Sequence, residues 1–381
     1  MDISSLFQFY QTPEKQPQNP YEELIRDLEL QVLDSHFFLK EKAFPMENPE
    51  RLKELFPFSG LLDIKGRLLD IYPEQILFLD FETLGLKSTS MNFPIVTGLG
   101  FYKEGNFHLR QYLLFNMSSE EELLEILLDY FSRFPFLATY NGKKFDMPFL
   151  ESRFRFYQKE FSKDLHHFDV YHLWKRLLPK NFPDGFSQKN LERKILNYHR
   201  KDDIESKRIP EIFYDFLKYQ HHEEFPKVLQ HNEWDVVNLF FLFVEALDLM
   251  KNKDQNLNLP IAKLLFRNQL YEEVISFLKN YQPHDSEEEK LYHRLLFNSF
   301  YKIRNYEQAA ESLKNLITID PKPKEIMIMI RILEKKLFRN QEAAKYIELL
   351  LQYQQANPNE KFIINREKLE KRKEKNKTYL L

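Results

Sequence analysis

The sequence predicts an α/β protein, in which a mixed β-sheet flanked by helices is followed by an all-α domain of helical repeats. Strand and turn signals alternate with helical signals in the first half of the chain. All eight glycines lie at or before Gly185, and beyond it apolar residues recur with the period of a helix. Because glycine is the residue most used in tight turns, we expect the sheet to lie in the first half.

The length of 381 residues exceeds the roughly 100–200 residues of one ordinary domain, so several parts are expected. We assign residues 1–70 to an N-terminal extension and residues 71–252 to the domain that contains the sheet. The helical repeats follow at 258–360, and residues 361–381 form a charged tail.

Composition limits the chemistry. Cysteine is absent, so any metal must be held by carboxylate, imidazole or backbone oxygen, which favours hard ions such as Mg²⁺ or Mn²⁺. The net charge is −3, so the protein as a whole lacks the excess positive charge that binds nucleic acid regardless of sequence. The N-terminus lacks a leader pattern and no apolar run reaches roughly 18–20 residues, so we expect a cytoplasmic protein without a membrane partner.

Three strands are expected to form a meander at the start of the sheet domain. The apolar run at 76–81 suits a buried strand. Two further candidates lie at 95–102 and 107–115, and the polar segment 103–106 between them has the length of a hairpin connection.

A helix and a strand should follow the meander. Ser119 and Glu122 predict a capping box at the start of an amphipathic helix that ends near Arg133. Another short strand is expected at 136–140. The order of elements therefore favours a mixed sheet with helices on its faces.

Acidic side chains mark the end of the first predicted strand. Asp80 and Glu82 are two residues apart, so their carboxylates project from the same face of the sheet. Two carboxylates this close repel one another unless a cation lies between them. On its own, such a pair is more often a solvated strand end than a metal site.

Two later acids lie at helical positions. Asp146 opens a helix after a turn, where helix capping is the alternative to metal binding. His231 and Asp235 are four residues apart in a helix expected from about residue 223 to residue 250, so they share a helix face. Taken alone, this spacing is more typical of a surface or core pair than of a catalytic one.

Two weaker candidates have simpler interpretations. Asp169 is either an additional acid of the site or, more simply, a buried structural carboxylate. Asp202 and Asp203 are most simply an acidic pair in a loop.

Together these segments resemble the DEDD superfamily of 3′→5′ exonucleases, and within it the YprB-like ribonuclease H-like family. The matching segments are Phe78-Leu79-Asp80-Phe81-Glu82, Asn141-Gly142-Lys143-Lys144-Phe145-Asp146 and His231-Asn232-Glu233-Trp234-Asp235. The stretch 186–214 also looks like that family, and the resemblance covers roughly residues 55–250. It implies a ribonuclease H-like fold and a metal-dependent nuclease that acts on DNA or RNA.

The resemblance also implies how two divalent cations, Mg²⁺ or Mn²⁺, would be held. Asp80 would bridge the two ions, and Glu82 and Asp235 would complete the ion that activates water. Asp146 would hold the other ion.

Further roles concern the proton and the substrate. In the superfamily either Tyr stands four residues before the last Asp or His stands five before it, whereas here His231 takes the position of the Tyr. Three roles for His231 therefore stay open: it acts as the base, it only orients water, or it does neither. The residues implied beside the terminal nucleotide and its phosphate are Asn141, Gly142, Lys143 and Lys144.

An internal repeat occupies the helical half. Residues 270–274 align with 305–309 at a shift of 35 residues, and Arg304-Asn305 recurs as Arg339-Asn340. The period is close to the roughly 34 residues of a tetratricopeptide unit, so about three tetratricopeptide-like units are predicted. They form a concave surface for a protein partner or only stabilise the preceding domain. The charged run at 366–377 is most simply a solvated tail.

Two functions remain in competition. The first is a metal-dependent 3′→5′ exonuclease. The second is a catalytically silent nucleic-acid-binding or scaffold protein that recruits a partner through its repeats. The presence of all four acids argues against silence, because an abandoned metal site has no physical reason to keep mutually repelling carboxylates.

Overall fold

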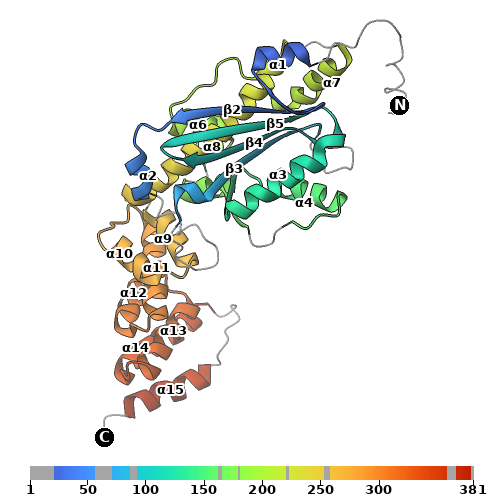
Figure 1. The fold of residues 1–381 in the computed structure, drawn as a ribbon. Helices are drawn as coiled ribbons and strands as arrows, with labels where there is room; N and C mark the ends of the chain where they lie inside the picture. The colour runs from blue at the N-terminus through green and yellow to red at the C-terminus, as the bar shows by residue number, and fades with distance from the viewer. Residues whose placement is uncertain are drawn as a thin grey trace, which may run out of the picture. The chain divides into compact units, whose positions relative to one another are not determined.

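The computed structural model describes residues 21–55, 71–85, 92–161, 165–178, 181–219, 223–252, 258–357 and 366–378. The chain divides into two compact units. Unit 1 comprises Met1–Glu54, Tyr72–His172 and Pro183–Glu245, and unit 2 comprises Leu55–Ile71, Leu173–Phe182 and Ala246–Leu381. Unit 1 holds the β-sheet, and the C-terminal part of unit 2 is helical (Figure 1).

A single seven-stranded sheet forms the centre of unit 1, in the order β1-β2-β5-β4-β3-β6-β7. Its strands are β1 (Gln31–Asp34), β2 (Phe37–Pro45), β3 (Ile76–Thr83), β4 (Pro94–Lys103), β5 (Asn106–Leu114), β6 (Phe136–Thr139) and β7 (His166–Asp169). β3, β4 and β5 form the predicted antiparallel meander. β6 runs parallel to β3 and β7 runs parallel to β6, so the sheet is mixed as expected.

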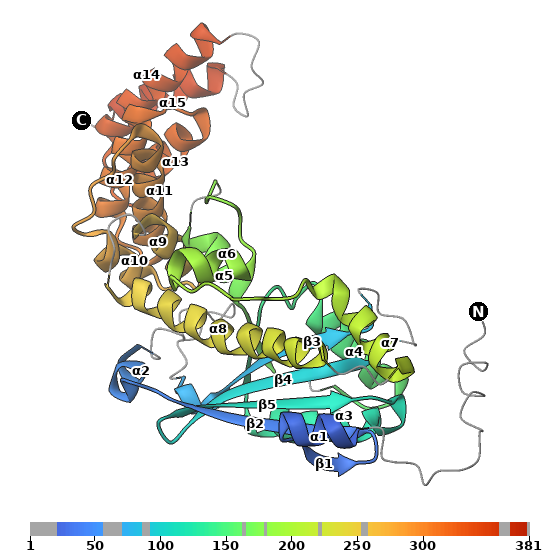
Figure 2. The ribbon, with the colours of Figure 1, turned by 90° about the horizontal axis from the view of Figure 1, so that it is seen from above.

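Different helices cover the two faces of this sheet. On one face, α3 (Glu120–Arg133) and α4 (Asp146–Phe156) share the main core with Leu77 and Leu79 of β3. On the other, α8 (Phe225–Asn252) runs along the sheet (Figure 2), and its Phe240 and Phe243 contact Phe78 edge-on. Since strand side chains alternate between faces, the next two residues on the Phe78 side are Asp80 and Glu82, which therefore face α8.

Two glycines of β4 let α8 lie close to the sheet. A Cβ atom at Gly98 would lie 2.4 Å from Oδ1 of Asn232, and one at Gly100 would lie 2.6 Å from Cγ1 of Val236. The strand register pairs Gly98 with Asp80. The missing side chains thus bring α8 against the strand end that carries the first two acids.

The region predicted as an N-terminal extension contributes two strands to the sheet. Between α1 (Glu22–Leu28) and α2 (Pro49–Leu55) the chain forms β1 and β2, and β2 pairs antiparallel with β5 along its whole length. We did not predict these strands, because prolines interrupt this part of the chain and three consecutive charged residues, Lys40 to Lys42, break the apolar pattern of β2. Residues 1–20 and 56–70 lie outside the described residues.

The predicted capping box of α3 is wrong, although the helix itself is present. The hydroxyl of Ser119 donates to Asp34 over 3.0 Å, and no side chain caps the helix. The next residue, Glu120, is buried and accepts two hydrogen bonds of 2.5 Å from Arg153 of α4. A buried ion pair therefore ties the two helices of this face together.

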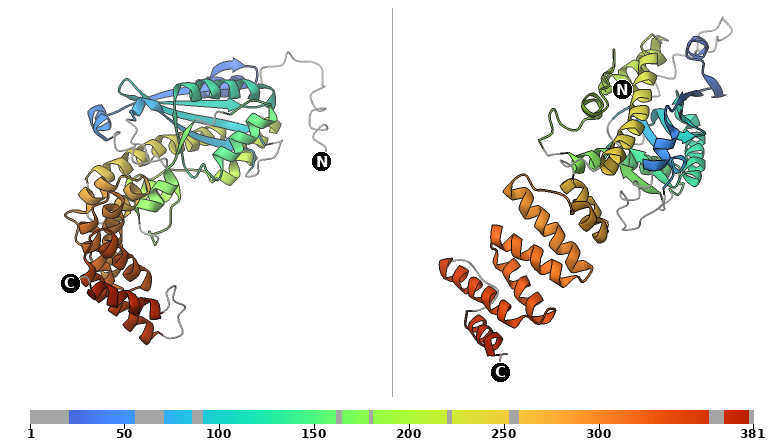
Figure 3. Two further views of the ribbon diagram at one scale, coloured as in Figure 1. Left: turned by 90° about the horizontal axis from the view of Figure 1, so that it is seen from below. Right: turned by 90° about the vertical axis from the view of Figure 1, so that its left-hand side faces the viewer.

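Three further helices precede α8: α5 (Val170–Leu177), α6 (Gln188–Ile195) and α7 (Ile209–Tyr219). After α8 come α9 (Asn258–Arg267), α10 (Tyr271–Leu278), α11 (Ser286–Lys302), α12 (Tyr306–Ile319), α13 (Pro323–Lys335), α14 (Asn340–Ala356) and α15 (Arg366–Thr378). From α9 to α15 each helix packs on the next one, as the orange and red helices of Figure 3 show. No helix among the described stretches has both the length and the apolar character needed to cross a membrane.

The repeat found in the sequence is matched by a regular spacing of left-handed backbone conformations. Gln269, Arg304 and Phe338 adopt left-handed backbone conformations, and each stands shortly before the second helix of a pair, α10, α12 or α14. These positions are separated by 35 and 34 residues, which matches the shift found in the sequence. Three similar helical hairpins follow from this spacing, while their assignment as tetratricopeptide-like units stays a prediction.

Residues 366–378 differ from the solvated tail that we expected. They form α15, in which Leu369 is fully buried against the core of the helical region. Arg372 of α15 donates to Glu334 of α13 over 2.5 Å. A buried leucine, the ion pairs of Arg372 with Glu334 and of Lys373 with Glu348, and a hydrogen bond from Asn376 to Glu334 thus hold this mostly charged helix.

Replacing Gly98 with Ala should lower the free energy of unfolding by about 1–3 kcal/mol, because the new methyl group overlaps Asn232 of α8. Gly85→Ala is the matched control, since a Cβ atom there meets nothing within 4 Å. Urea unfolding followed by circular dichroism measures both. Equal stability of the two variants would show that α8 does not lie this close to β4.

Candidate metal centre

Four acidic side chains converge from three elements of unit 1. Asp80 and Glu82 come from β3, Asp146 from the first turn of α4, and Asp235 from α8. Glu82 is buried, while the other three retain partial exposure, so a cation can reach them. The N-cap position of α4 belongs to Phe145, which means that Asp146 is not the capping residue.

The electrostatics of these acids reflects their proximity. Burial raises the pKa of Asp80 well above its ordinary value, and the charges of Asp235 and Asp146 raise it further. Burial and the charge of Asp80 likewise raise the pKa of Glu82. The pKa of Asp146 is raised to about 7, mainly by burial. Such a group of carboxylates is stable in its charged form only next to compensating positive charge.

Three of the side chains could share one ion. Ligand atoms of Glu82, His231 and Asp235 all lie within 4.8 Å of one another. Nε2 of His231 is 3.2 Å from Oδ2 of Asp235 and 3.8 Å from Oε1 of Glu82. The sequence spacing of four between His231 and Asp235 therefore does bring them to one site.

His231 is held by an acid that we had interpreted as part of a loop. Its Nδ1 atom is 2.6 Å from Oδ1 of Asp203, and its Nε2 atom is 3.1 Å from the hydroxyl of Ser206. Burial lowers the pKa of His231, but the hydrogen bonds to Asp203 and Asp235 outweigh burial and raise it to about 10. His231 is therefore a cation in this arrangement.

A second cation, Arg200, joins three acids around the centre. It donates to both oxygens of Glu192, to Oδ2 of Asp203 over 3.2 Å and to Oδ1 of Asp235 over 2.5 Å. Its side chain is only 4% exposed. Neither Arg200 nor Glu192 was predicted to act here, although both fall in the stretch 186–214 that resembles the family.

Asn232 fixes the position of Asp80. Its Nδ2 atom donates to Oδ2 of Asp80 over 2.9 Å, and its Oδ1 atom accepts from Gln111 over 3.0 Å. Gln111 is itself anchored on the carbonyl of Leu229. This buried chain of amides connects β5, α8 and β3 at the acidic end of the sheet.

The turn predicted to lie beside the substrate adjoins Asp146. A Cβ atom at Gly142 would lie 1.9 Å from Oγ1 of Thr139 and 2.9 Å from Oδ2 of Asp146, so only glycine fits. Lys143 and Lys144 are exposed on the same turn.

Asp169 supports this turn through hydrogen bonds to its backbone. Its carboxylate accepts from the amides of Asn141 and Lys143, each over 3.1 Å. Asn141 has a left-handed backbone conformation that brings these amides toward it. These bonds account for Asp169 as a structural carboxylate, the simpler of its two interpretations.

Comparison with known proteins finds similarity in the part of the chain that carries these acids. Residues 77–247 match the model of a family described as the RNase_H superfamily. The curated protein "Uncharacterized protein YprB" of Bacillus subtilis (strain 168) is 28% identical over 225 residues, which cover 55% of this chain and 53% of that protein. The chain thus spans about half the length of this relative.

Replacing Arg200 with Gln should lower the free energy of unfolding by about 3–5 kcal/mol, because buried Glu192 loses its ion-pair partner. Arg193→Gln is the control, since the ion pair of Arg193 with Asp184 is exposed and is worth less than about 1 kcal/mol. Chemical denaturation of both variants tests this. Similar losses in the two variants would contradict the structural role of Arg200.

Proposed function

Since residues 77–247 carry a domain of the RNase H superfamily, we propose that this chain is a divalent-metal-dependent nuclease that hydrolyses phosphodiester bonds of DNA or RNA. The proposal includes 3′→5′ exonuclease polarity, in keeping with the resemblance of the three acidic segments. The observation that carries it is the group of four mutually repelling carboxylates at the end of β3.

The donor set fits Mg²⁺ or Mn²⁺, because these hard ions prefer carboxylate oxygen. A pair of such ions supplies an activated water and stabilises the leaving oxygen of the phosphodiester. Asp80, which Asn232 orients, would help to hold both ions. Glu82 and Asp235 would hold the ion on the water side, and Asp146 would hold the other.

His231 is the proposed proton acceptor. Asp203 holds its Nδ1 atom, which leaves Nε2 directed at the acidic centre, between Glu82 and Asp235. An imidazolium cannot accept a proton, but positive charge bound to the neighbouring carboxylates disfavours the imidazolium and lowers the pKa of His231. Next to bound cations His231 would therefore be neutral, and its Nε2 atom would accept a proton from water.

The turn at 141–144 is the proposed contact for the end of the strand. Gly142 packs closely against Thr139 and Asp146, which holds the backbone of this turn directly beside the acidic centre. The exposed ammonium groups of Lys143 and Lys144 can reach a phosphate. Phosphate contacts of this kind position a substrate without reading its sequence.

We also propose that the three helical hairpins are tetratricopeptide-like units that bind a protein partner. The regular spacing of their left-handed residues supports a repeat. In repeat proteins such stacking produces an extended concave surface for partners.

Asp80→Asn should reduce the rate of strand degradation by more than roughly 100-fold, because even changes outside the direct ligands of a metal cost about 10–100-fold. The assay uses end-labelled single-stranded and duplex DNA and RNA with Mn²⁺ or Mg²⁺. Asp202→Asn is the control, since Asp202 is exposed and Asn keeps its left-handed backbone favourable. No degradation of any substrate by the unmodified protein, or equal rates in both variants, would refute the nuclease.

Manganese should raise the melting temperature of the protein, because a ligand that binds only the folded state stabilises it by about 2.7 kcal/mol at roughly 100 times its Kd. Asp80→Asn should melt higher than the unmodified protein in EDTA, since one repelling charge is removed, and should gain less from manganese. Differential scanning calorimetry with and without manganese measures both effects. An equal gain in the two proteins would exclude Asp80 from the metal site.

A further inference from the structure

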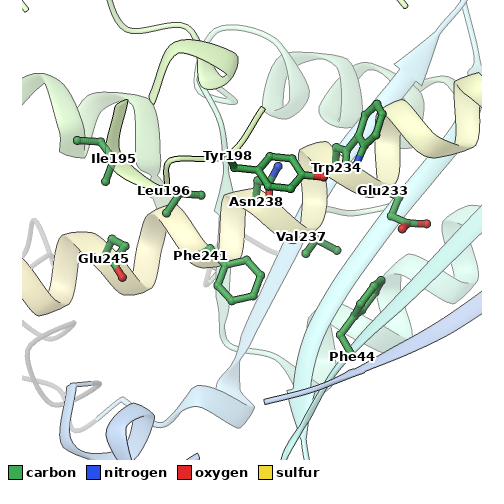
Figure 4. Close-up of a pocket in the computed structure, with 10 residues that line it drawn as sticks. All are labelled: Phe44, Ile195, Leu196, Tyr198, Glu233, Trp234, Val237, Asn238, Phe241 and Glu245. Atoms are coloured by element: carbon green, nitrogen blue, oxygen red, sulfur yellow. The ribbon is translucent and has the colours of Figure 1, made fainter. Parts of the chain in front are cut away.

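A second feature of unit 1 lies on the outer side of α8. An open cavity of about 470 Å³ is bounded by β2, the segment after α6, and α8 (Figure 4). Its lining includes Phe44, Tyr198, Trp234, Asn238 and Phe241. We propose that this cavity binds an unpaired base of a nucleic-acid strand. The proposal goes beyond the hydrolysis proposed above, because such binding requires no metal ion.

Aromatic rings form the walls of the cavity. Tyr198 and Phe241 are 38% and 37% exposed, so their rings are accessible to a ligand. Trp234 lines the cavity beside them and is itself partly exposed. Flat aromatic surfaces of this kind stack on any base, because every base has a π-face.

An amide inside the cavity lacks a partner. Nδ2 of Asn238 is buried and has no hydrogen-bond partner among the described residues. A buried donor without a partner is unfavourable, and an acceptor on a ligand removes that cost. The amide of Asn offers a donor and an acceptor side by side, which is the pattern that base edges complement.

Basic side chains lead to the cavity along β2. Lys40 and Lys42 share one face of the strand with Phe44, since the three alternate with exposed residues. This face is turned to α8, because Phe44 and Lys40 stand opposite Phe107 and Gln111, which contact that helix.

The charges favour a base inside the cavity and a phosphate outside it. Glu233 and Glu245 line the cavity and already pair with Lys42 and Arg51, so a phosphate gains little inside it. Lys42 forms an ion pair with Glu233, whereas burial and the charge of Lys42 lower the pKa of Lys40, so Lys40 gains from an added anion. A strand therefore fits with one base among the rings and its backbone along the face of β2 that carries Lys42 and Lys40.

The cavity is separate from the acidic centre but adjoins it. Trp234 precedes Asp235 in α8, and successive helical residues point roughly 100° apart. Arg200 links the two places, since its guanidinium lies 5.8 Å from the ring centre of Trp234 while it donates to Asp235. A base held here anchors a strand beside the carboxylates.

The test measures binding of a fluorescein-labelled oligothymidylate of about 12 nucleotides to the full chain in EDTA, by anisotropy. An abasic strand of equal length is the matched probe, because it keeps the phosphates and lacks the bases. We expect the abasic strand to bind about tenfold more weakly. Phe241→Ala should weaken binding of oligothymidylate about tenfold and leave binding of the abasic strand unchanged. Lys40→Glu should weaken binding of both strands.

Tyr214→Ala is the control, since Tyr214 is an exposed aromatic residue of α7 that does not line the cavity. Equal binding of the two strands, an unchanged affinity in Phe241→Ala, or a dimer that Phe241→Ala dissociates would overturn the proposal. Because EDTA prevents metal-dependent cleavage, failure of this test leaves the proposed nuclease untouched, and failure of the nuclease assay leaves this site untouched.

Discussion

Mutual repulsion of four carboxylates is the constraint on which the rest of unit 1 depends. Burial and neighbouring charge raise the pKa of Asp80 and of Glu82, so holding these groups together opposes folding. Two features of the fold hold the acids together: β3 is buried on both faces, and α8 packs closely against the sheet. Because Gly98 has no side chain, α8 comes close enough for Asn232 to donate a hydrogen bond to Asp80. The acidic group is thus held together by the packing and the hydrogen bonds around it.

Positive charge from the chain itself offsets part of this repulsion. Arg200 and His231 contact Asp235 from two directions, and each is held by a further acid, Glu192 or Asp203. Paired in this way, buried charges avoid the large cost of an isolated ion. The same ion pairs also orient the side chains, so one network both neutralises the carboxylates and positions them.

The parts of this structure that the sequence predicted are those with a local pattern. The apolar run before Asp80 and the helical periodicity around Asp235 act over a few residues, and both elements are present. The contact of Arg200 with Asp235 joins residues 35 positions apart and has no local signal. The same holds for β2, whose charged residues resemble a loop until pairing with β5 defines a strand. Long-range pairing therefore limits what a single sequence reveals.

The buried pair of Glu120 and Arg153 constrains how this protein can vary. Both side chains are almost fully enclosed, and Tyr157 adds a hydrogen bond to Glu120 over 3.1 Å. Replacement of either partner alone leaves an unpaired charge in the interior. Replacement of both by apolar residues of similar volume often leaves the stability unchanged. The two positions are consequently able to drift during evolution only in concert, and homologous chains should retain both charges or neither.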